Sequence, residues 1–300
     1  MPAPRFSVII PAYNASKFIK NALDSVRTQT FSDYEIIVVN DGSIDDTLKV
    51  IKDYFSKFPI LKHKIINQEN KGIGAARNAG IKVAEAEYIA FLDADDRWFR
   101  EKLATVKKFF DENSDVDLVC HDEFLVKNGK VLKTLRYGPY NTYGDLLFRG
   151  NCISTSATVV KRQKILQAGL FSENLDFNGV EDYDLWLRLS KICRIEYLHK
   201  VLGEYNVHSA GITSNIITHR QNVINVIEHH FKNWPKKSFY YKYLIRRRKA
   251  KVLLAGAYAY FKRGDLSNGM RYLARSLWFD PFIGIDKVIV KITNIFGKIY

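Results

Sequence analysis

Three aspartates lie within four positions directly after the apolar stretch Tyr88–Leu92. Because side chains alternate faces along an extended chain, we expect Asp93 and Asp95 on one side and Asp96 turned differently where the strand ends. Carboxylates this close repel one another, and a hard divalent cation would relieve the repulsion while keeping positions open for a diphosphate. The alternative is an acidic strand-to-helix turn in which one aspartate caps a helix that begins near Trp98.

A second acidic pair, Glu181 and Asp182, opens a helix predicted at Val180–Ser190. Adjacent carboxylates at a helix start gain from the helix dipole, so a structural role is one interpretation. The other is acid–base chemistry, in which a carboxylate lies within hydrogen-bond reach of the hydroxyl whose proton it accepts. The pair by itself does not decide between them.

The segments around the first acidic group alternate between apolar strands and amphipathic helices. Nearly continuous apolar strands in this alternation indicate a parallel α/β sheet covered by helices on both faces. Strands are predicted at Phe6–Pro11, Glu35–Asn40, Lys64–Gln68 and Tyr88–Leu92, and helices at Ser16–Gln29, Asp45–Phe55 and Gly74–Ala84.

Polar residues follow three of these strands, at Pro11–Asn14, Asn40–Gly42 and Asp93–Asp96. Ligands of parallel α/β sheets bind beyond the carboxyl ends of the strands. Three polar clusters therefore fall at one edge of one sheet, which favours a binding site over a simple acidic turn.

Beyond residue 116 the pattern loosens. Short strands are predicted at Val116–Cys120, Phe124–Val126, Val131–Leu135 and Thr155–Val160, with a short helix at Tyr143–Phe148. Further helices are predicted at Thr218–Lys232, Ser238–Arg263, Asn268–Trp278 and Ile283–Ile295.

The net charge of +14 is concentrated near the C-terminus, where residues 211–300 contain 17 Lys and Arg against 4 Asp and Glu. Residues 1–210 contain 29 against 28. Such asymmetry marks a part that faces a polyanion, so we divide the chain into a domain at 1–210 and a basic helical region at 211–300. Basic residues beside aromatic ones suit an anionic membrane surface, contacted through residues 236–300. Nucleic acid is the less favoured partner, and a solvated helix face is the structural alternative.

Three widely spaced cysteines argue against a disulfide framework and fit a reducing cytoplasm. No apolar run approaches the ~18 to 20 residues that span a bilayer, and no signal-peptide pattern precedes Phe6. We expect a cytoplasmic protein, or a peripheral one on the inner face of the cytoplasmic membrane if the basic region binds lipid.

The ordered motifs of the chain resemble those of the family 2 glycosyltransferases, and the resemblance covers roughly residues 4–210. It implies the GT-A fold of nucleotide-diphospho-sugar transferases, here followed by a C-terminal helical extension. The motifs are specific for the family and poorly specific for the substrate. They are Ser7-Val-Ile-Ile-Pro-Ala-Tyr-Asn14, Val39-Asn-Asp-Gly-Ser43, Ala76-Arg-Asn-Ala-Gly80, Phe91-Leu-Asp-Ala-Asp-Asp96 and Gly179-Val-Glu-Asp-Tyr-Asp-Leu-Trp-Leu-Arg188.

The resemblance implies roles in nucleotide-sugar binding for Pro11, Tyr13, Asp41, Arg77, Asp93 and Asp95. In the family, the aspartate that matches Asp41 accepts a hydrogen bond from the uracil ring. The alternative role of Asp41 is a cap for the helix predicted at Asp45–Phe55. Tyr13 would stack on the base, or else is a partly buried aromatic at a strand end. The guanidinium of Arg77 would meet uracil or phosphate oxygens, or else pairs with an acidic neighbour.

A divalent cation, Mn²⁺ or Mg²⁺, is the cofactor that the resemblance implies. Asp93 would contact the ribose or the metal, Asp95 would be a direct ligand, and Asp96 would support the loop. His208 resembles a late histidine that completes the metal shell; a solvated or structural loop histidine is the alternative. Many members carry Arg two positions earlier, and Asn206 stands there in this chain, which weakens the case for a phosphate contact.

The family's catalytic base matches Asp182, with Glu181 orienting the acceptor or the base. The sequence thus predicts a metal-dependent inverting glycosyltransferase, a hexosyl- or N-acetylhexosaminyltransferase that moves a sugar from a UDP-sugar to a hydroxyl of a glycan or lipid-linked glycan, as in bacterial surface polysaccharide synthesis. One rival is transfer to a polyprenyl phosphate, which would not need Asp182, and another is a non-catalytic nucleotide-sugar or nucleic-acid binding module. A nucleotidyltransferase would need a glycine-rich, lysine-bearing loop that the start of the chain lacks.

Overall fold

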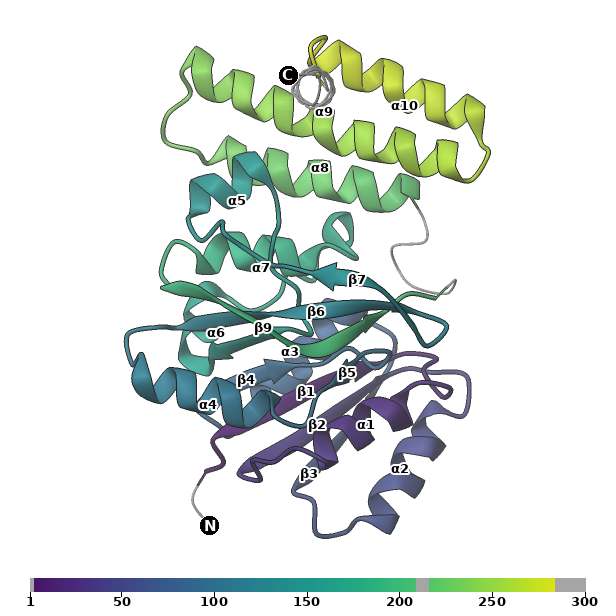
Figure 1. Ribbon diagram of the computed structural model, residues 1–300, viewed down its shortest axis with the longest axis vertical. Helices are drawn as coiled ribbons and strands as arrows, with labels where there is room; N and C mark the ends of the chain where they lie inside the picture. Colours follow the sequence, from purple (N-terminus) through teal and green to yellow (C-terminus); the bar gives the residue numbers. More distant parts are fainter. Residues whose placement is uncertain (1–2, 209–215, 284–300) are drawn as a thin grey trace, which may run out of the picture. The chain divides into compact units, whose positions relative to one another are not determined.

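The computed structural model describes residues 3–208 and 216–283, and the chain separates into two compact units (Figure 1). The first unit comprises Met1–Leu146 and Asn151–Gly211, and the second comprises Leu147–Gly150 and Ile212–Tyr300. The first contains a large β-sheet and both acidic groups, whereas the described part of the second is built mainly from helices.

One mixed sheet forms the frame of the first unit. Among the described residues its strands follow the order β3–β2–β1–β4–β8–β6–β9–β5, and β7 pairs with β6 outside this path. The strands span Phe6–Ala12 (β1), Tyr34–Asp41 (β2), His63–Gln68 (β3), Tyr88–Phe91 (β4), Arg97–Trp98 (β5), Leu118–Lys127 (β6), Lys130–Leu135 (β7), Thr158–Lys161 (β8) and Ile195–Asn206 (β9).

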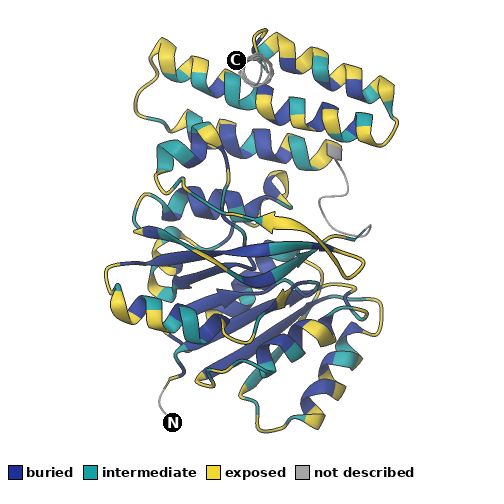
Figure 2. Cartoon of the chain, in the orientation of Figure 1, coloured by how far each residue is buried: buried dark blue, intermediate teal, exposed yellow. Residues whose placement is uncertain are grey.

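The four strands β3, β2, β1 and β4 are all parallel, and every residue of β1 and β2 is buried (Figure 2). Their continuous apolar sequence is explained by helices on both faces, which confirms the predicted α/β class. On one face Val8 and Ile10 share a core with three helices. On the other face Gly80 lies so close to Ile9 that a Cβ would come within 2.7 Å of its side chain. The three helices are α1 (Ile19–Arg27), α2 (Thr47–Lys57) and α4 (Lys102–Glu112), and Gly80 belongs to α3 (Ile73–Val83).

The other half of the sheet is mixed. Strand β8 is antiparallel to both β4 and β6, and β9 is parallel to β6. The two strands predicted at Val116–Cys120 and Phe124–Val126 are one strand, β6, whose register with β9 shifts near Asp122. Neither β9 nor the helices α4 and α6 (Arg162–Ala168) were predicted, because polar residues interrupt the apolar pattern there. Trp98 lies in β5, so α4 begins four residues later than the alternative helix start.

The parallel register brings the three predicted polar clusters to one edge of the sheet. Ala12 at the end of β1 is level with Asn40 of β2, and Ile9 of β1 is level with Phe91 at the end of β4. The segments that follow these strands therefore leave the sheet on the same side, with the acidic run Asp93–Asp96 among them.

The second unit contains α8 (Ile216–Lys232), α9 (Phe239–Lys262) and α10 (Leu266–Phe279). The Asp265 side chain accepts the Asn268 N–H at 3.1 Å and caps α10. Aromatic rings of Phe148, Trp234 and Tyr241 pack together, with centroids 4.9 to 5.5 Å apart. The helix predicted at Ile283–Ile295 lies outside the described residues. Within those residues, none of the helices combines the length and apolar character needed to cross a membrane.

Candidate active site

The acidic run after β4 forms a tight turn, in which the Asp96 N–H donates to the Asp93 carbonyl at 3.0 Å. Asp93 and Asp95 are partly exposed, whereas Asp96 is buried and points inward. Its carboxylate accepts hydrogen bonds from Ser156 Oγ at 2.6 Å and from the Asn206 N–H at 2.8 Å. Asp96 therefore fixes the loop, while the other two aspartates are available to face a ligand.

A buried lysine lies beneath this turn. Lys102 is fully buried; its Nζ donates to the Ser156 carbonyl at 2.7 Å and lies 3.5 Å from the centre of the Trp98 ring. Burial lowers the pKa of Lys102 well below its ordinary value, although Glu123 and Asp96 oppose that shift. Burial, followed by the charges of Asp95 and Glu123, raises the pKa of Asp96 well above its ordinary value.

His208 contacts the acidic run directly. Its Nε2 lies 2.6 Å from Asp95 Oδ2, its ring stacks on Phe18 with centroids 4.6 Å apart, and its buried Nδ1 has no hydrogen-bond partner within residues 3–208 and 216–283. Asn206 holds the same region by donating its side-chain N–H to the Asp95 carbonyl at 2.9 Å. The structure thus brings together His208 and Asp95, the residues for which the resemblance implies a metal contact, and the stacked ring of His208 is not freely solvated.

The donor set at this point suits a divalent cation as a partial shell. A carboxylate oxygen and an imidazole nitrogen are compatible with Mn²⁺. In the described ranges 3–208 and 216–283, however, no three or more His, Cys, Asp or Glu side chains are gathered in a group that could hold a metal ion. One oxygen of Asp93 is already paired with Arg77 at 2.7 Å. Asp95 and His208, together with the second oxygen of Asp93, are donors that suit a cation, and a complete shell would need further ligands from outside the described protein residues.

Asp41, at the end of β2, organises the loop that leads into α3. Its carboxylate accepts the N–H groups of Lys71 and Gly72, each at 2.9 Å, and the Gln68 side-chain N–H at 2.8 Å. Asp41 does not cap α2, whose N-cap residue is Asp46; the Thr47 N–H at the start of the helix donates to the Asp45 carboxylate at 3.0 Å. The capping role that the sequence offered for Asp41 is therefore not the one that the structure shows.

Tyr13 follows β1 and exposes half of its surface, whereas Pro11 is buried inside the strand. Asn14 joins this strand end to the one next to it. Its N–H donates to Ser43 Oγ and its side-chain oxygen accepts the Ile44 N–H, both at 3.0 Å. The Tyr13 ring is therefore presented to solvent from a fixed loop.

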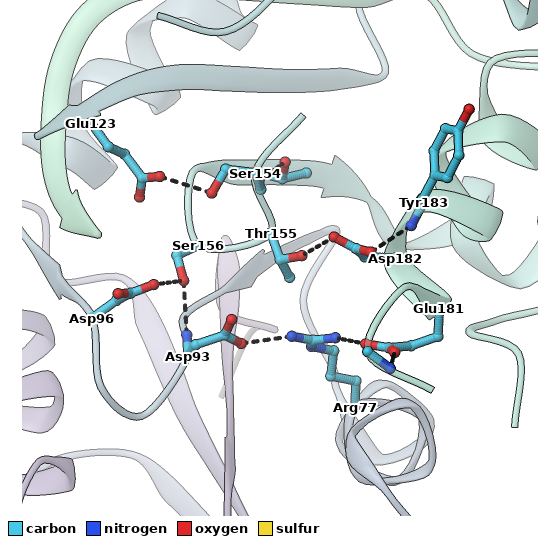
Figure 3. A network of polar contacts seen from close by, with 12 residues as sticks. Arg77, Asp93, Asp96, Glu123, Ser154, Thr155, Ser156, Glu181, Asp182 and Tyr183 are labelled. Atoms are coloured by element: carbon cyan, nitrogen blue, oxygen red, sulfur yellow. Dashed lines mark hydrogen bonds and ion pairs between the residues drawn. The ribbon is translucent and has the colours of Figure 1, made fainter. Parts of the chain in front are cut away.

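Arg77 connects the two acidic groups (Figure 3). It is buried in α3, donating from Nη1 to Glu181 Oε1 at 2.6 Å and from Nη2 to Asp93 Oδ1 at 2.7 Å. Gly74 permits this approach, because a Cβ there would lie 2.7 Å from the Ser172 carbonyl and 3.2 Å from Glu181 Cγ. Burial opposes the charge of Arg77, but Asp93 and Glu181 outweigh it and raise its pKa. Of the two roles that the sequence left open, pairing with acidic neighbours is the one that this geometry displays.

Asp182 is the second residue of α7 (Glu181–Leu189) and lies beside this bridge. Its Oδ1 accepts the Tyr183 N–H at 2.6 Å, and its Oδ2 accepts the Thr155 hydroxyl at 3.2 Å. Although part of the side chain reaches solvent, the dense surroundings of the carboxyl and the adjacent charge of Glu181 raise the pKa of Asp182 to about 7, against the opposing charge of Arg77. A carboxyl that titrates near neutral pH is suited to acid–base work.

Three polar residues at this site were not singled out in the sequence. Ser154, Thr155 and Ser156 precede β8, and each contacts a different acidic side chain (Figure 3). The sequence placed Thr155 and Ser156 in the strand predicted at Thr155–Val160, whereas β8 begins only at Thr158. The one available signal was their alternation, which places the middle residue on the opposite side from its neighbours.

Comparison with known proteins identifies the family. A model described as Glycosyl transferase family 2 matches residues 7–167. An uncharacterized glycosyltransferase of Rickettsia bellii is 31% identical over 232 residues, which is 76% of this chain and 33% of that protein. The putative teichuronic acid biosynthesis glycosyltransferase TuaG of Bacillus subtilis is 30% identical over 214 residues, covering 71% of this chain and 82% of TuaG. The chain thus spans a third of the first relative and most of the second.

Two solved structures share the fold. TarS 1–349 of S. aureus, in complex with UDP-GlcNAc, aligns with a TM-score of 0.66 and 20% identity over 90% of each chain. The mannosyltransferase PcManGT from Pyrobaculum calidifontis, in complex with GDP-Man and Mn²⁺, aligns with a TM-score of 0.64 and 20% identity over 97% of this chain and 81% of its own. The family model covers more than half of the chain, so this protein belongs to glycosyl transferase family 2 and is a glycosyltransferase with the GT-A fold.

Proposed function

We propose that this glycosyltransferase moves a sugar from a nucleoside diphosphate sugar, with a UDP-sugar as the first candidate, to a hydroxyl of a glycan acceptor with inversion at the anomeric carbon. One observation carries the proposal. Arg77 pairs with both Asp93 and Glu181, which are 88 residues apart in the sequence, so Asp93 and Asp182, the residue after Glu181, lie around a common region (Figure 3). Such an arrangement suits a donor diphosphate on one side and an acceptor hydroxyl on the other.

On the donor side, Asp95 and His208 would hold the cation and Asp93 would contact the ribose or the cation. A bound Mn²⁺ or Mg²⁺ supplies charge neutralisation for the departing diphosphate. Tyr13 presents an exposed ring for the base, and Asp41 keeps acceptor capacity beyond its three hydrogen bonds, since each carboxylate oxygen has two lone pairs. The neighbours with UDP-GlcNAc, and with GDP-Man and Mn²⁺, support a metal and a nucleotide sugar without choosing between uridine and guanosine.

On the acceptor side, Asp182 would take the proton of the attacking hydroxyl. Each of its oxygens accepts one hydrogen bond from the protein, and each has a second lone pair with which an acceptor can bond. Glu181 is buried, and its two oxygens accept from Arg77 Nη1 and from the Gly179 N–H, whereas Asp182 is partly exposed, so Glu181 would position the base and not replace it.

The acceptor is proposed to be a growing glycan, alone or on a lipid carrier. Two relatives support a polysaccharide product: one is named a chondroitin synthase, and the other is named for teichuronic acid biosynthesis. At a membrane surface, the second unit would contribute exposed aromatic side chains beside cations. Phe239 and Trp278 are 87% and 70% exposed, and the Arg246 guanidinium lies 5.8 Å from the Trp278 ring. Rings with neighbouring cations suit the interface of an anionic bilayer.

Co-sedimentation with vesicles tests the membrane part. Binding to phosphatidylglycerol-containing vesicles and not to phosphatidylcholine vesicles is expected, with losses in Phe239→Ser and Trp278→Ser. Tyr258→Ser is the matched control, because Tyr258 is equally exposed but lies about 28 Å along α9 from Phe239. Equal failure to bind both vesicle types would rule out the membrane contact.

A thermal-shift screen of UDP- and GDP-sugars, with Mn²⁺ and with EDTA, tests the donor part. We expect one nucleotide sugar to raise the unfolding temperature only in Mn²⁺ or Mg²⁺, and Asp95→Ala to abolish that effect. Turnover of that donor should then disappear in Asp182→Asn. Full activity of Asp182→Asn would favour a phosphate acceptor, which is already anionic, and unchanged donor binding in Asp95→Ala would contradict the proposed metal site.

A further inference from the structure

The segment Ser154–Ser156 runs between the two acidic groups and contacts both (Figure 3). Ser154 Oγ donates to Glu123 Oε2 at 2.8 Å and Ser156 Oγ donates to Asp96 Oδ2 at 2.6 Å, whereas Thr155 turns the other way. The Thr155 hydroxyl donates to Asp182 Oδ2 at 3.2 Å. The side chains of three consecutive residues thus reach β6 (Ser154), the start of α7 (Thr155) and the loop after β4 (Ser156).

Ser156 also contacts the backbone of the acidic run after β4. Its Oγ accepts the backbone N–H of Asp93 at 3.1 Å while donating to the Asp96 carboxylate. Its carbonyl accepts from Trp98 Nε1 at 2.8 Å and from Lys102 Nζ at 2.7 Å. One serine therefore holds the backbone of the first aspartate and the side chain of the third.

The segment itself is held rigidly. Thr155 and Ser156 are 6% and 1% exposed. The Thr158 hydroxyl donates to the Ser154 carbonyl at 2.6 Å, and the Thr158 N–H donates to the Thr155 carbonyl at 3.0 Å. Groups whose own hydrogen bonds are satisfied in this way can orient a functional side chain without further reorganisation.

We propose that Thr155 is a positioning residue for the base Asp182, and that Ser154–Ser156 sets the distance between that base and the aspartates after β4. The inference rests on the proposed function. The Tyr183 N–H and the Thr155 hydroxyl each hold one carboxylate oxygen, which fixes the plane of the carboxylate. Without the Thr155 hydroxyl, the Asp182 carboxylate could rotate about its side-chain bonds and lose its alignment with an acceptor hydroxyl.

The Thr155 hydroxyl also has an electrostatic effect on the Asp182 carboxylate that an apolar side chain of the same size lacks. Among the described residues, Glu181 on the same helix and Arg77 from α3 are the charged groups that most affect the pKa of Asp182. The Thr155 hydroxyl is a neutral donor to Asp182, as is the Tyr183 N–H, and a donor stabilises the charged carboxylate. Its removal leaves both charges in place, so a change in titration reports the lost hydrogen bond.

The test is a carbon-13 titration of the Asp182 carboxyl in the full-length protein, assigned by the signal missing from Asp182→Asn. It needs no substrate. In Thr155→Val the apparent pKa is expected to rise by about one unit or more, since a hydrogen bond to a charged group contributes on the order of one to two pKa units. Thr155→Ser keeps the hydroxyl and should titrate as wild type. Thr134→Val, at an exposed site on β7, is the matched control and should change nothing.

An Asp182 titration in Thr155→Val that coincides with wild type would overturn the inference, provided that the variant unfolds cooperatively. If the valine prevents folding, Thr155→Ala supplies the same measurement without the added methyl group. Donor turnover separates this inference from the proposed function. Retained turnover in Asp182→Asn would defeat the base assignment itself, whereas lost turnover there with an unchanged titration in Thr155→Val defeats only the role of Thr155.

Discussion

Arg77→Met tests the ion-pair bridge that joins the two acidic groups. The Arg77 and Glu181 side chains are only 3% and 5% exposed, and methionine would leave the Glu181 carboxylate buried without its cation. Removing one partner of a buried ion pair costs about 3 to 5 kcal/mol. The unfolding temperature of a domain of this size falls by about 2 to 4 °C per kcal/mol, so we expect a loss of roughly 10 °C.

Arg97→Met is the matched control. Arg97 lies 3.6 Å from Glu204 with 53% of its side chain exposed, and solvent screening limits such a pair to less than about 1 kcal/mol. Arg77→Lys should fall between the two variants, because an ammonium group cannot reproduce the planar fork that reaches both carboxylates. Thermal unfolding followed by circular dichroism measures all three. An unfolding temperature for Arg77→Met no lower than that for Arg97→Met would refute the bridge.

Two further substitutions test other parts of the site. The pKa of Asp182 is raised from 3.8 to about 7 in the folded protein, so the folded state retains a proton that the unfolded chain releases, and the stability decreases as the pH rises between these values. In urea unfolding, the free energy of unfolding of Asp182→Asn should therefore match that of wild type near pH 4 and exceed it by about 2 to 4 kcal/mol near pH 8. An equal difference in unfolding free energy at both pH values would contradict this explanation. Asp41→Ala leaves the Lys71 N–H without its acceptor and the Gly72 N–H with only its longer bond to Asn70 Oδ1 at 3.2 Å, and should cost about 1 to 3 kcal/mol. The exposed Asp46 serves as its control, and equal stability of Asp41→Ala and Asp46→Ala would exclude the anchoring role.

The parallel half of the sheet was predictable because its signal is local. Runs such as Val8–Ile10 are apolar without interruption, and a chain of this kind must be buried on both faces. Once the strands are parallel, their carboxyl ends meet, and the position of Asp41 near the acidic run follows. Strand β9 gave no such signal, since Ile195–Asn206 mixes polar and apolar residues and its pairing depends on β6, about 77 residues earlier.

Side-chain partners were less predictable than elements. The sequence offered Asp41 as a cap for α2, and only the folded loop shows that its carboxylate accepts the Lys71 and Gly72 N–H groups while Asp45 reaches the Thr47 N–H. The sequence offered Arg77 either a nucleotide or an acidic partner, but could not indicate that Glu181 lies beside it, because 104 residues separate them. Thr155 was hidden for the same reason, as its contact with Asp182 exists only once α7 has packed near β8.

A crystal structure with UDP and Mn²⁺ tests the central claim most directly. We expect the anomalous signal of manganese within coordination distance of Asp95 and His208, the diphosphate on that ion, and the Asp182 carboxylate facing the position of the transferred sugar. Manganese or UDP bound at another surface, with Asp95 and Asp182 uninvolved, would contradict the proposed active site.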